Sequence, residues 1–556
     1  MKHPFFALFL ALTLLLPVQA RAARDKELVP IADSISNYLR ERTTVRSYVS
    51  VEKATVLKDG TLRLTLGRGL VDYPLRDQEI KDIQAIASEL LPRKYAQYRN
   101  KLSLYADKKP IEYYKSRYFS GKAPATGPVK EHRKYAGQYH DKLAAPLVRR
   151  MDAAVRPTRG LQNRHIAMWQ SHGWYYEQSL KRWEWQRARI FETVEDLYTQ
   201  SYVVPFLVPM LENAGAVVLL PRERDWNTRE IIVDNDDSRS GYFESGSWDA
   251  AIDSGFANPK AAYLYKENPF RMGTARIATT DPDGGSSAAW LPIIPESGEY
   301  AVYVSYQTVK NSTTGAQYEV RHKGGTTRFS VNQQMGGRTW IYLGRFPFEK
   351  GRHSDQGVFL SNVGDGHSAV TCDAVKFGGG MGNMARKPAE VKEGDFDVEP
   401  EISGYPRFTE GSRYWLQWAG FNDTIYSRNQ NMTDYNDDYM SRGLWVNTLS
   451  DGSYLKPDKK GYNITLDLSF AFHTDAGTTM NDSIVGTLAI YTRLSNDEEK
   501  YPNGEDRSLG RDMTDIIQTQ IVGDIRALYE PQWSRRQLWD RSYAESRMPE
   551  VPGMLL

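Results

Sequence analysis

The sequence predicts a multi-domain protein: an α/β domain with a parallel-type sheet and flanking helices, an inserted all-β sandwich or jelly roll, and a small N-terminal α/β domain. Its 556 residues exceed what one hydrophobic core usually holds. Residues 161–220 read as strand, helix and strand in that order, which is typical of a βαβ unit. Residues 230–385 contain short alternating strands separated by Gly and Asn turns, the pattern of a sandwich.

The N-terminal segment predicts that the protein is exported. Residues 1–23 combine Lys2, an apolar run and small residues, which predicts a secretory signal peptide. No later stretch is apolar enough to cross a bilayer. We therefore expect a periplasmic, cell-surface or extracellular protein. The 71 basic and 69 acidic residues nearly cancel, so nothing indicates a nucleic-acid partner.

The N-terminal half is expected to begin with the small domain at 24–120. Strands at 48–56 and 61–66 flank a Lys-Asp-Gly turn, and a helix follows at 77–91. Residues 121–160 are polar and rich in Lys, Arg and Pro, so we predict a linker.

The α/β domain is expected in two parts. The first, 161–229, has a strand at 164–170, a helix at 193–213 that Pro205 and Pro209 should kink or split, and a strand at 216–220. The second, 386–556, has a loop-rich aromatic stretch to about 460, strands at 461–496 and a helix at 512–528. An apolar run ends at Leu556, so we expect this part to be truncated within a strand.

Histidines and carboxylates are the only plausible metal ligands. A single cysteine, Cys372, excludes intrachain disulfides and cysteine-based zinc sites, and its alternating surroundings predict a packed strand residue. His172 ends one predicted strand and is followed by Gly173. His473 lies on the polar face of another, at the start of a loop, where catalytic groups usually lie. Spacing alone pairs these two weakly, because 301 residues separate them.

These segments resemble a zinc-dependent N-acetylmuramoyl-L-alanine amidase, a family that cleaves peptidoglycan. His172-Gly173 matches the family's strand ending in His-Gly. Glu195 heads a helix that ends at Gly215, and the strand after it runs into Arg222-Glu-Arg-Asp225. Ser469-Phe-Ala-Phe-His473-Thr-Asp475 is similar to the strand of the family's second histidine, with a slightly longer spacing.

The resemblance implies that His172, Glu195 and His473 bind Zn²⁺, with Glu192 as the rival to Glu195. It implies a general-base glutamate directly after Leu556, a position the sequence does not contain. Asp475 would orient one of the ligand histidines or cap the turn. Arg222 is also a candidate for supporting a metal ligand, and we expect Arg222 and Asp225 to anchor the strand end rather than to touch substrate. A departure is the aromatic segment from Trp174 to Gln186, where the family usually has glycines.

The inserted sandwich resembles the golvesin C-terminal-like domain, a module also found in proteins labelled xanthan lyase. The similarity lies in segments 300–306, 322–329, 337–344 and 374–379. The amidase resemblance implies a secreted zinc hydrolase that cleaves the lactyl–L-Ala amide of peptidoglycan, and the expected partner is peptidoglycan or another cell-envelope glycan. Two alternatives stay open: a non-catalytic glycan-binding protein on a degenerate amidase scaffold, and a polysaccharide lyase.

Overall fold

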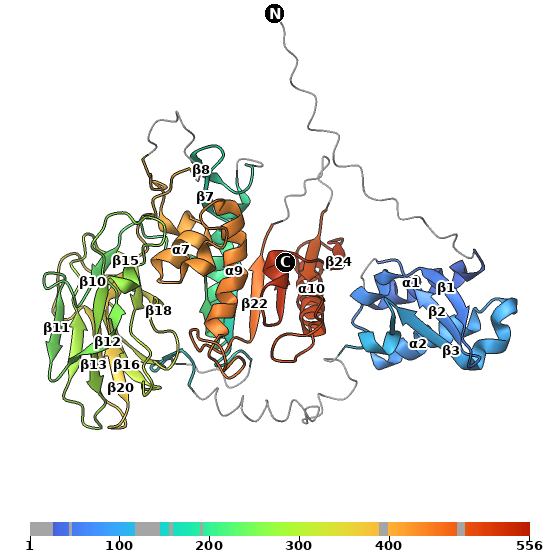
Figure 1. Cartoon of the computed structure of the whole chain (residues 1–556), viewed down its shortest axis with the longest axis horizontal. Helices are drawn as coiled ribbons and strands as arrows, with labels where there is room; N and C mark the ends of the chain where they lie inside the picture. Colours follow the sequence, from blue (N-terminus) through green and yellow to red (C-terminus); the bar gives the residue numbers. More distant parts are fainter. Residues whose placement is uncertain are drawn as a thin grey trace, which may run out of the picture. The chain divides into compact units, whose positions relative to one another are not determined.

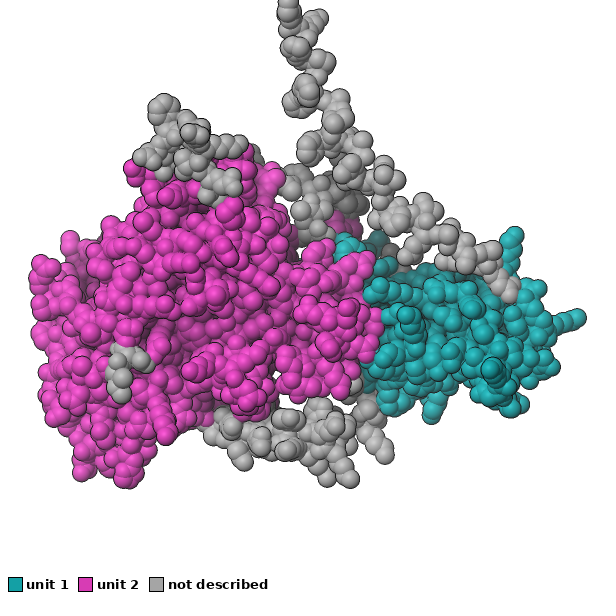
Figure 2. All heavy atoms as spheres, in the orientation of Figure 1, with its two compact units in different colours: residues 1–126, 486–488, 515–539 teal, residues 127–485, 489–514, 540–556 magenta. Residues whose placement is uncertain are grey.

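The chain forms two compact units (Figure 2). A computed structural model describes residues 26–43, 47–116, 145–154, 160–189, 193–388, 399–474 and 484–556. The first unit comprises residues 1–126, 486–488 and 515–539, and the second comprises 127–485, 489–514 and 540–556. The predicted signal peptide, residues 1–23, lies outside the described residues and stays a prediction.

The N-terminal part of the first unit is a four-stranded sheet with two helices. The strand order is β1 (Val51–Val56), β2 (Leu62–Leu66), β3 (Leu102–Ala106) and β4 (Lys109–Pro110). Strands β2 and β3 are parallel, so a crossover must join them, and it contains α2 (Asp77–Glu89). Helix α1 (Val29–Thr43) precedes the sheet, and apolar residues of both helices and of β1, β2 and β3 form one buried core. The small α/β arrangement agrees with the prediction.

The second unit contains the β-sandwich region, drawn in green to yellow in Figure 1. Its sheets have the orders β10-β21-β15-β18, β11-β14-β19-β16-β17-β5 and β12-β13-β20. The strands are β10 (Ile231–Val233), β11 (Tyr242–Ser245), β12 (Asp249–Gly255), β13 (Gly273–Thr279), β14 (Ser287–Trp290), β15 (Gly298–Val304), β16 (Ala316–His322), β17 (Gly325–Val331), β18 (Ile341–Phe348), β19 (Gly357–Ser361), β20 (Ala369–Cys372) and β21 (Val375–Phe377).

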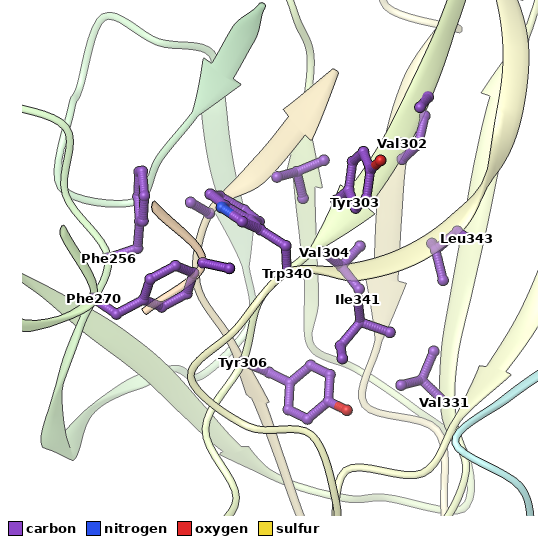
Figure 3. Packing of buried hydrophobic residues seen from close by; sticks show 14 of the residues in the cluster. Phe256, Phe270, Val302, Tyr303, Val304, Tyr306, Val331, Trp340, Ile341 and Leu343 are labelled. Carbon is purple, nitrogen blue, oxygen red and sulfur yellow. The ribbon is translucent and has the colours of Figure 1, made fainter. Parts of the chain in front are cut away.

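Aromatic side chains fill the centre of this region (Figure 3). Trp340 packs against Phe256 and Phe270, with ring centroids 4.7 and 5.2 Å apart. The first pair is tilted and the second is edge-to-face, and edge-to-face contacts add to the stabilisation that burial of the rings provides. Cys372 is buried in β20, as its alternating surroundings predicted.

The linker prediction for residues 121–160 is wrong in one segment. Residues Val148–Arg150 form β5, which pairs antiparallel with β17 at the edge of the six-stranded sandwich sheet. The Val-Arg-Arg sequence shows no apolar alternation. Backbone hydrogen bonds to a sheet edge more than 170 residues away in the sequence hold this strand, so it needs no such pattern. Composition therefore could not identify it.

A second six-stranded sheet draws its strands from both sides of the sandwich in the sequence. Its order is β24 (Arg535–Asp540), β23 (Thr487–Tyr491), β25 (Gly553–Leu555), β22 (Leu468–Phe472), β6 (His165–Gln170) and β9 (Val217–Leu219). Strands β25, β22, β6 and β9 are parallel neighbours, whereas β23 runs antiparallel to β25. The carboxyl ends of β6 and β22 therefore lie side by side.

The predicted helix between β6 and β9 is divided, as Pro205 and Pro209 suggested. It consists of α4 (Glu195–Tyr198), α5 (Gln200–Tyr202), a π-helical segment (Val203–Leu207) and α6 (Val208–Asn213). Proline lacks the N–H that an α-helical hydrogen bond needs, which explains the irregular segment around Pro205.

The prediction that residues 400–460 are loop-rich is wrong. They form α7 (Ser412–Trp418), α8 (Asp423–Tyr426) and α9 (Asp434–Ser450), and α9 lies between α7 and β22 in Figure 1. Helix α9 escaped detection because much of its buried face is ionic. Asp434, Asp438 and Arg442 are almost fully buried and form ion pairs, so the usual apolar period of a helix is absent. Helices α10 (Ser508–Leu528) and α11 (Ala544–Arg547), and the hairpin β7 (Trp174–Glu177)–β8 (Arg182–Trp185), complete the fold.

Candidate metal centre

Three side chains predicted from the sequence converge at the carboxyl ends of β6 and β22. His172, Glu195 and His473 each offer one ligand atom, and these atoms all lie within 4.8 Å of one another. The Oε1 atom of Glu195 is 3.1 Å from Nδ1 of His473 and 3.9 Å from Nδ1 of His172. All three side chains are largely buried, with 6, 9 and 11% of His172, Glu195 and His473 exposed.

The sheet explains why residues so distant in the sequence meet. His172 follows β6 and His473 follows β22, and these strands are parallel neighbours. The backbone N–H of Ser171 donates to the carbonyl of Phe472, which continues the pairing beyond the strands. Glu195 is the first residue of α4 and hydrogen-bonds the Thr474 backbone N–H at 3.1 Å. Functional groups commonly gather at this edge of α/β sheets.

Gly173 is required by close packing. A Cβ atom at this position would lie 2.6 Å from the backbone of Glu410 and Gly411. The chain entering α7 therefore passes directly over the residue that follows His172, and the Gly411 N–H donates to the carbonyl of Trp174. The glycine of the His-Gly pair thus fixes the backbone beside a candidate ligand.

The donor set fits a zinc ion. Two imidazoles and one carboxylate are the ligands of many hydrolytic zinc sites, which keep a further position open. Ligand atoms around a tetrahedral zinc are about 3.3 Å apart, given bonds of about 2.0–2.1 Å. The 3.1 Å separation between Glu195 and His473 lies close to this value, whereas the 3.9 Å separation between Glu195 and His172 is longer, so the set would have to close slightly around the ion. The residues therefore fit the metal that the sequence resemblance implies.

Glu545 is a functional candidate that sequence reasoning missed. Its Oε2 lies 2.9 Å from Nε2 of His473, and its Oε1 accepts from Trp169 Nε1 and Arg442 Nη1, each at 2.5 Å. Burial alone would raise the pKa of Glu545, but His473 and Arg442 outweigh it and lower the pKa to about 2. A carboxylate so weakly basic is suited to orienting His473, because general bases work best with a pKa near the operating pH.

The two histidines differ in their protonation. Burial lowers the pKa of His473, yet Glu545 and Glu195 on its two ring nitrogens reverse the effect and raise it to about 9. Burial, reinforced by the nearby His473, holds the pKa of His172 well below its usual range. His172 is therefore neutral and His473 is an imidazolium between two carboxylates.

Arg187, the residue after the aromatic segment Trp174–Gln186, contacts two of the candidate ligands. Its Nη2 lies 2.8 Å from Nε2 of His172, and its Nε lies 3.7 Å from Oε2 of Glu195. A guanidinium can only donate, so Nε2 of the neutral His172 must accept and Nδ1 must carry the proton. A metal on Nδ1 would move that proton to Nε2, facing Arg187. Metal binding at Nδ1 therefore requires Arg187 to move.

Arg222 holds the end of β6 through the backbone. It is 1% exposed and donates to the carbonyl oxygens of Gln170, His172 and Glu410. Asp225 accepts from the Ala301 N–H of β15 in the sandwich region. Both residues thus contact main chain, Arg222 at the end of β6 and Asp225 in β15. Asp475 and Glu192 lie outside the described residues, and the glutamate expected after Leu556 lies outside the sequence, so these assignments stay predictions.

Comparisons with known proteins concern the sandwich. Residues 231–379 match the Golvesin C-terminal domain family. Xanthan lyase of Bacillus sp. (strain GL1) is 31% identical over 150 residues, which are 26% of this chain and 14% of that enzyme. The chain thus spans only a small part of this relative.

Solved structures give weak superpositions on the same portion. A Paenibacillus xanthan lyase is 27% identical, covers 27% of this chain and 13% of its own, and has a TM-score of 0.22. The C-terminal carbohydrate-binding module (CBM6) of LamC from Zobellia galactanivorans is 14% identical, covers 27% and 99%, and has a TM-score of 0.18. TM-scores this low support no argument about fold or function.

Among the described residues, no helix is long and apolar enough to span a membrane.

Proposed function

We propose that this chain is an exported zinc hydrolase of the N-acetylmuramoyl-L-alanine amidase type, cleaving the amide between the lactyl group of peptidoglycan and L-alanine. The convergence of His172, Glu195 and His473 carries the proposal, since three largely buried side chains, with ligand atoms within 4.8 Å of one another, come from three segments that the family resemblance assigned to one site. The comparisons bear on the sandwich and leave this catalytic assignment to be tested.

The chain's own groups would have distinct tasks. His172, Glu195 and His473 would hold the ion through Nδ1, a carboxylate oxygen and Nδ1. A bound Zn²⁺ would supply Lewis acidity that polarises a substrate carbonyl and activates water. Glu545 would keep the proton of His473 on Nε2 and so leave Nδ1 free to bind, as carboxylates behind metal-binding histidines commonly do. Arg222 would fix the backbone of His172.

The sandwich would bind glycan. The supporting observations are the match of residues 231–379 to the Golvesin C-terminal domain family and the likeness to part of a xanthan lyase. Attachment to a polymer raises the local concentration of the catalytic part at its substrate.

A non-catalytic glycan-binding protein is the second candidate. The contact of Arg187 with His172 and Glu195 favours it, because a permanent guanidinium there would exclude the metal. A polysaccharide lyase is a weaker candidate, since the matched portion is 14% of the lyase relative.

One experiment separates these functions. The purified protein is incubated with peptidoglycan, and released products are identified by mass spectrometry. We expect free stem peptides, their loss with a chelator, and their return with Zn²⁺. The His473→Ala variant is the control for contaminating hydrolases. Binding to peptidoglycan without release in the zinc-supplemented protein would favour the non-catalytic candidate. Unsaturated sugars released from an acidic polysaccharide would favour the lyase.

A further inference from the structure

A polar cavity of about 700 Å³ lies in the second unit. None of the three candidate metal ligands lines it. Its walls come from three segments: Arg428 and the α9 residues Met440 and Leu444, the stretch 495–507, and residues 547–550 next to α11. The volume is within the range of small-molecule sites, about 300–1,000 Å³. Apolar side chains and several cations share its surface.

Arg507 is an unpaired buried cation in this cavity. Only 3% of the residue is exposed, and its Nε has no hydrogen-bond partner among the described residues. Its guanidinium stacks 4.5 Å from the centroid of the Tyr501 ring and makes one long hydrogen bond, 3.4 Å, to the carbonyl of Arg547. Burial lowers the pKa of Arg507, which reflects this poor compensation. A buried charge without a partner is costly.

Other buried arginines of the unit are compensated. Arg413 pairs with Asp434, Arg442 pairs with Asp438 and Glu545, and Arg224 pairs with Glu212. Arg222 lacks a carboxylate but donates to several carbonyl oxygens. Arg507 has neither arrangement. Its cost would be offset if an external anion entered the cavity.

The rest of the lining also favours an anion. Arg428, Lys500 and Arg547 line the cavity with Arg507, and none of the four forms an ion pair among the described residues. The acids in the lining are Glu498 and Glu550, and Glu550 is already paired with Lys456 and Lys459. The cations therefore exceed the available negative charge.

We propose that this cavity is a binding site for a carboxylate-bearing saccharide. Arginine recognises carboxylates through paired N–H donors, which a guanidinium can supply in a fixed geometry. The cavity is larger than an inorganic anion needs, and Met440, Leu444 and Met548 offer apolar surface to the carbon face of a sugar ring. The assignment is independent of the metal centre.

The test is calorimetric titration of the whole protein with digalacturonate, inorganic phosphate and uncharged galactobiose. Arg428→Gln removes an exposed lining cation and should fold normally, whereas Arg507→Gln removes the buried one. Arg239→Gln is the matched control, because Arg239 is a 93% exposed arginine in the sandwich region and is absent from the cavity. His473→Ala shows whether binding depends on the metal centre.

We expect digalacturonate to bind more weakly as salt is raised, and galactobiose not to bind. Arg507→Gln should weaken digalacturonate binding at least tenfold and Arg428→Gln about threefold, with Arg239→Gln and His473→Ala unchanged. The proposal is overturned if digalacturonate does not bind, if Arg428→Gln binds as tightly as Arg239→Gln, or if phosphate binds and digalacturonate does not.

Discussion

Removing the Arg187 guanidinium should tighten zinc binding. In the Arg187→Ala variant, His172 loses the donor 2.8 Å from its Nε2, and Glu195 loses a cation 3.7 Å from its Oε2. The proton can then sit on Nε2 of His172, which leaves Nδ1 free for the metal. Most metal-ligand substitutions weaken binding, so an increase in affinity is a distinctive outcome.

The magnitude follows from the hydrogen bond that the metal must displace. Hydrogen bonds to charged groups contribute about 1.5–3 kcal/mol. At about 1.4 kcal/mol for each factor of ten, the zinc Kd should fall about 10- to 150-fold. Loss of the positive charge beside a divalent cation acts in the same direction. Arg187→Lys keeps the positive charge without the planar guanidinium, so its zinc Kd should lie between those of the unmodified protein and Arg187→Ala.

The assay is competition for Zn²⁺ with a chromophoric chelator at neutral pH. Arg182→Ala is the matched control, because Arg182 lies in β8, close to Arg187 in the sequence, but is 64% exposed and pairs with Glu184. Its zinc Kd should equal that of the unmodified protein. An unchanged or higher Kd in Arg187→Ala would refute the reasoning that Arg187 competes with the metal.

Three further predictions concern single side chains. Glu545→Gln should weaken zinc binding about 10- to 100-fold in the same competition assay, because His473 loses the carboxylate on Nε2; an unchanged Kd would remove Glu545 from the site. Gly173→Ala should lower the free energy of unfolding by about 1–3 kcal/mol in denaturant titrations, since its Cβ would meet the Glu410 backbone at 2.6 Å. Gly523→Ala, in α10 with nothing near its Cβ, should not destabilise, and equal losses would contradict the packing argument. Burial raises the pKa of Asp234 from 3.8 to about 7, so its ionisation opposes folding. Stability from this group is therefore lost as pH rises from about 4 to 7, by at most about 4 kcal/mol. In Asp234→Asn, the free energy of unfolding should depend less on pH between about 4 and 7. The same pH dependence in both proteins would contradict the raised pKa of Asp234.

Strand periodicity placed two of the candidate metal ligands at strand ends, and the family resemblance joined them into one site. His172 and His473 end strands whose alternation or apolar character is visible, and parallel strands bring their carboxyl ends to one edge. Glu195 was assigned through the family resemblance alone. In the sandwich, the segments that carried the family resemblance all lie from β15 (Gly298–Val304) onward, whereas β10 to β14 were not located individually, although β12 and β13 are as long as β15.

The supporting residues could not be predicted for a physical reason. Glu545 lies in a four-residue helix, and its role depends on Arg442 of α9, a helix whose buried face is ionic. Ion-pair networks leave no periodic signal in a single sequence. Arg187 directly follows the aromatic segment that departs from the family pattern, and only the folded chain brings it against His172. In the sequence, the only sign of these two supporting residues is that each is a charged residue in or close to a short helix.

Zinc content after dialysis against Zn²⁺ and removal of free metal tests the central claim most directly. We predict a single zinc per chain in the unmodified protein, measured by mass spectrometry of the metal. His172→Ala and His473→Ala should each lose it, while His353→Ala, at a partly exposed position in the sandwich region, should keep it. An unmodified protein without zinc, or undiminished zinc in both ligand variants, would contradict the metal centre.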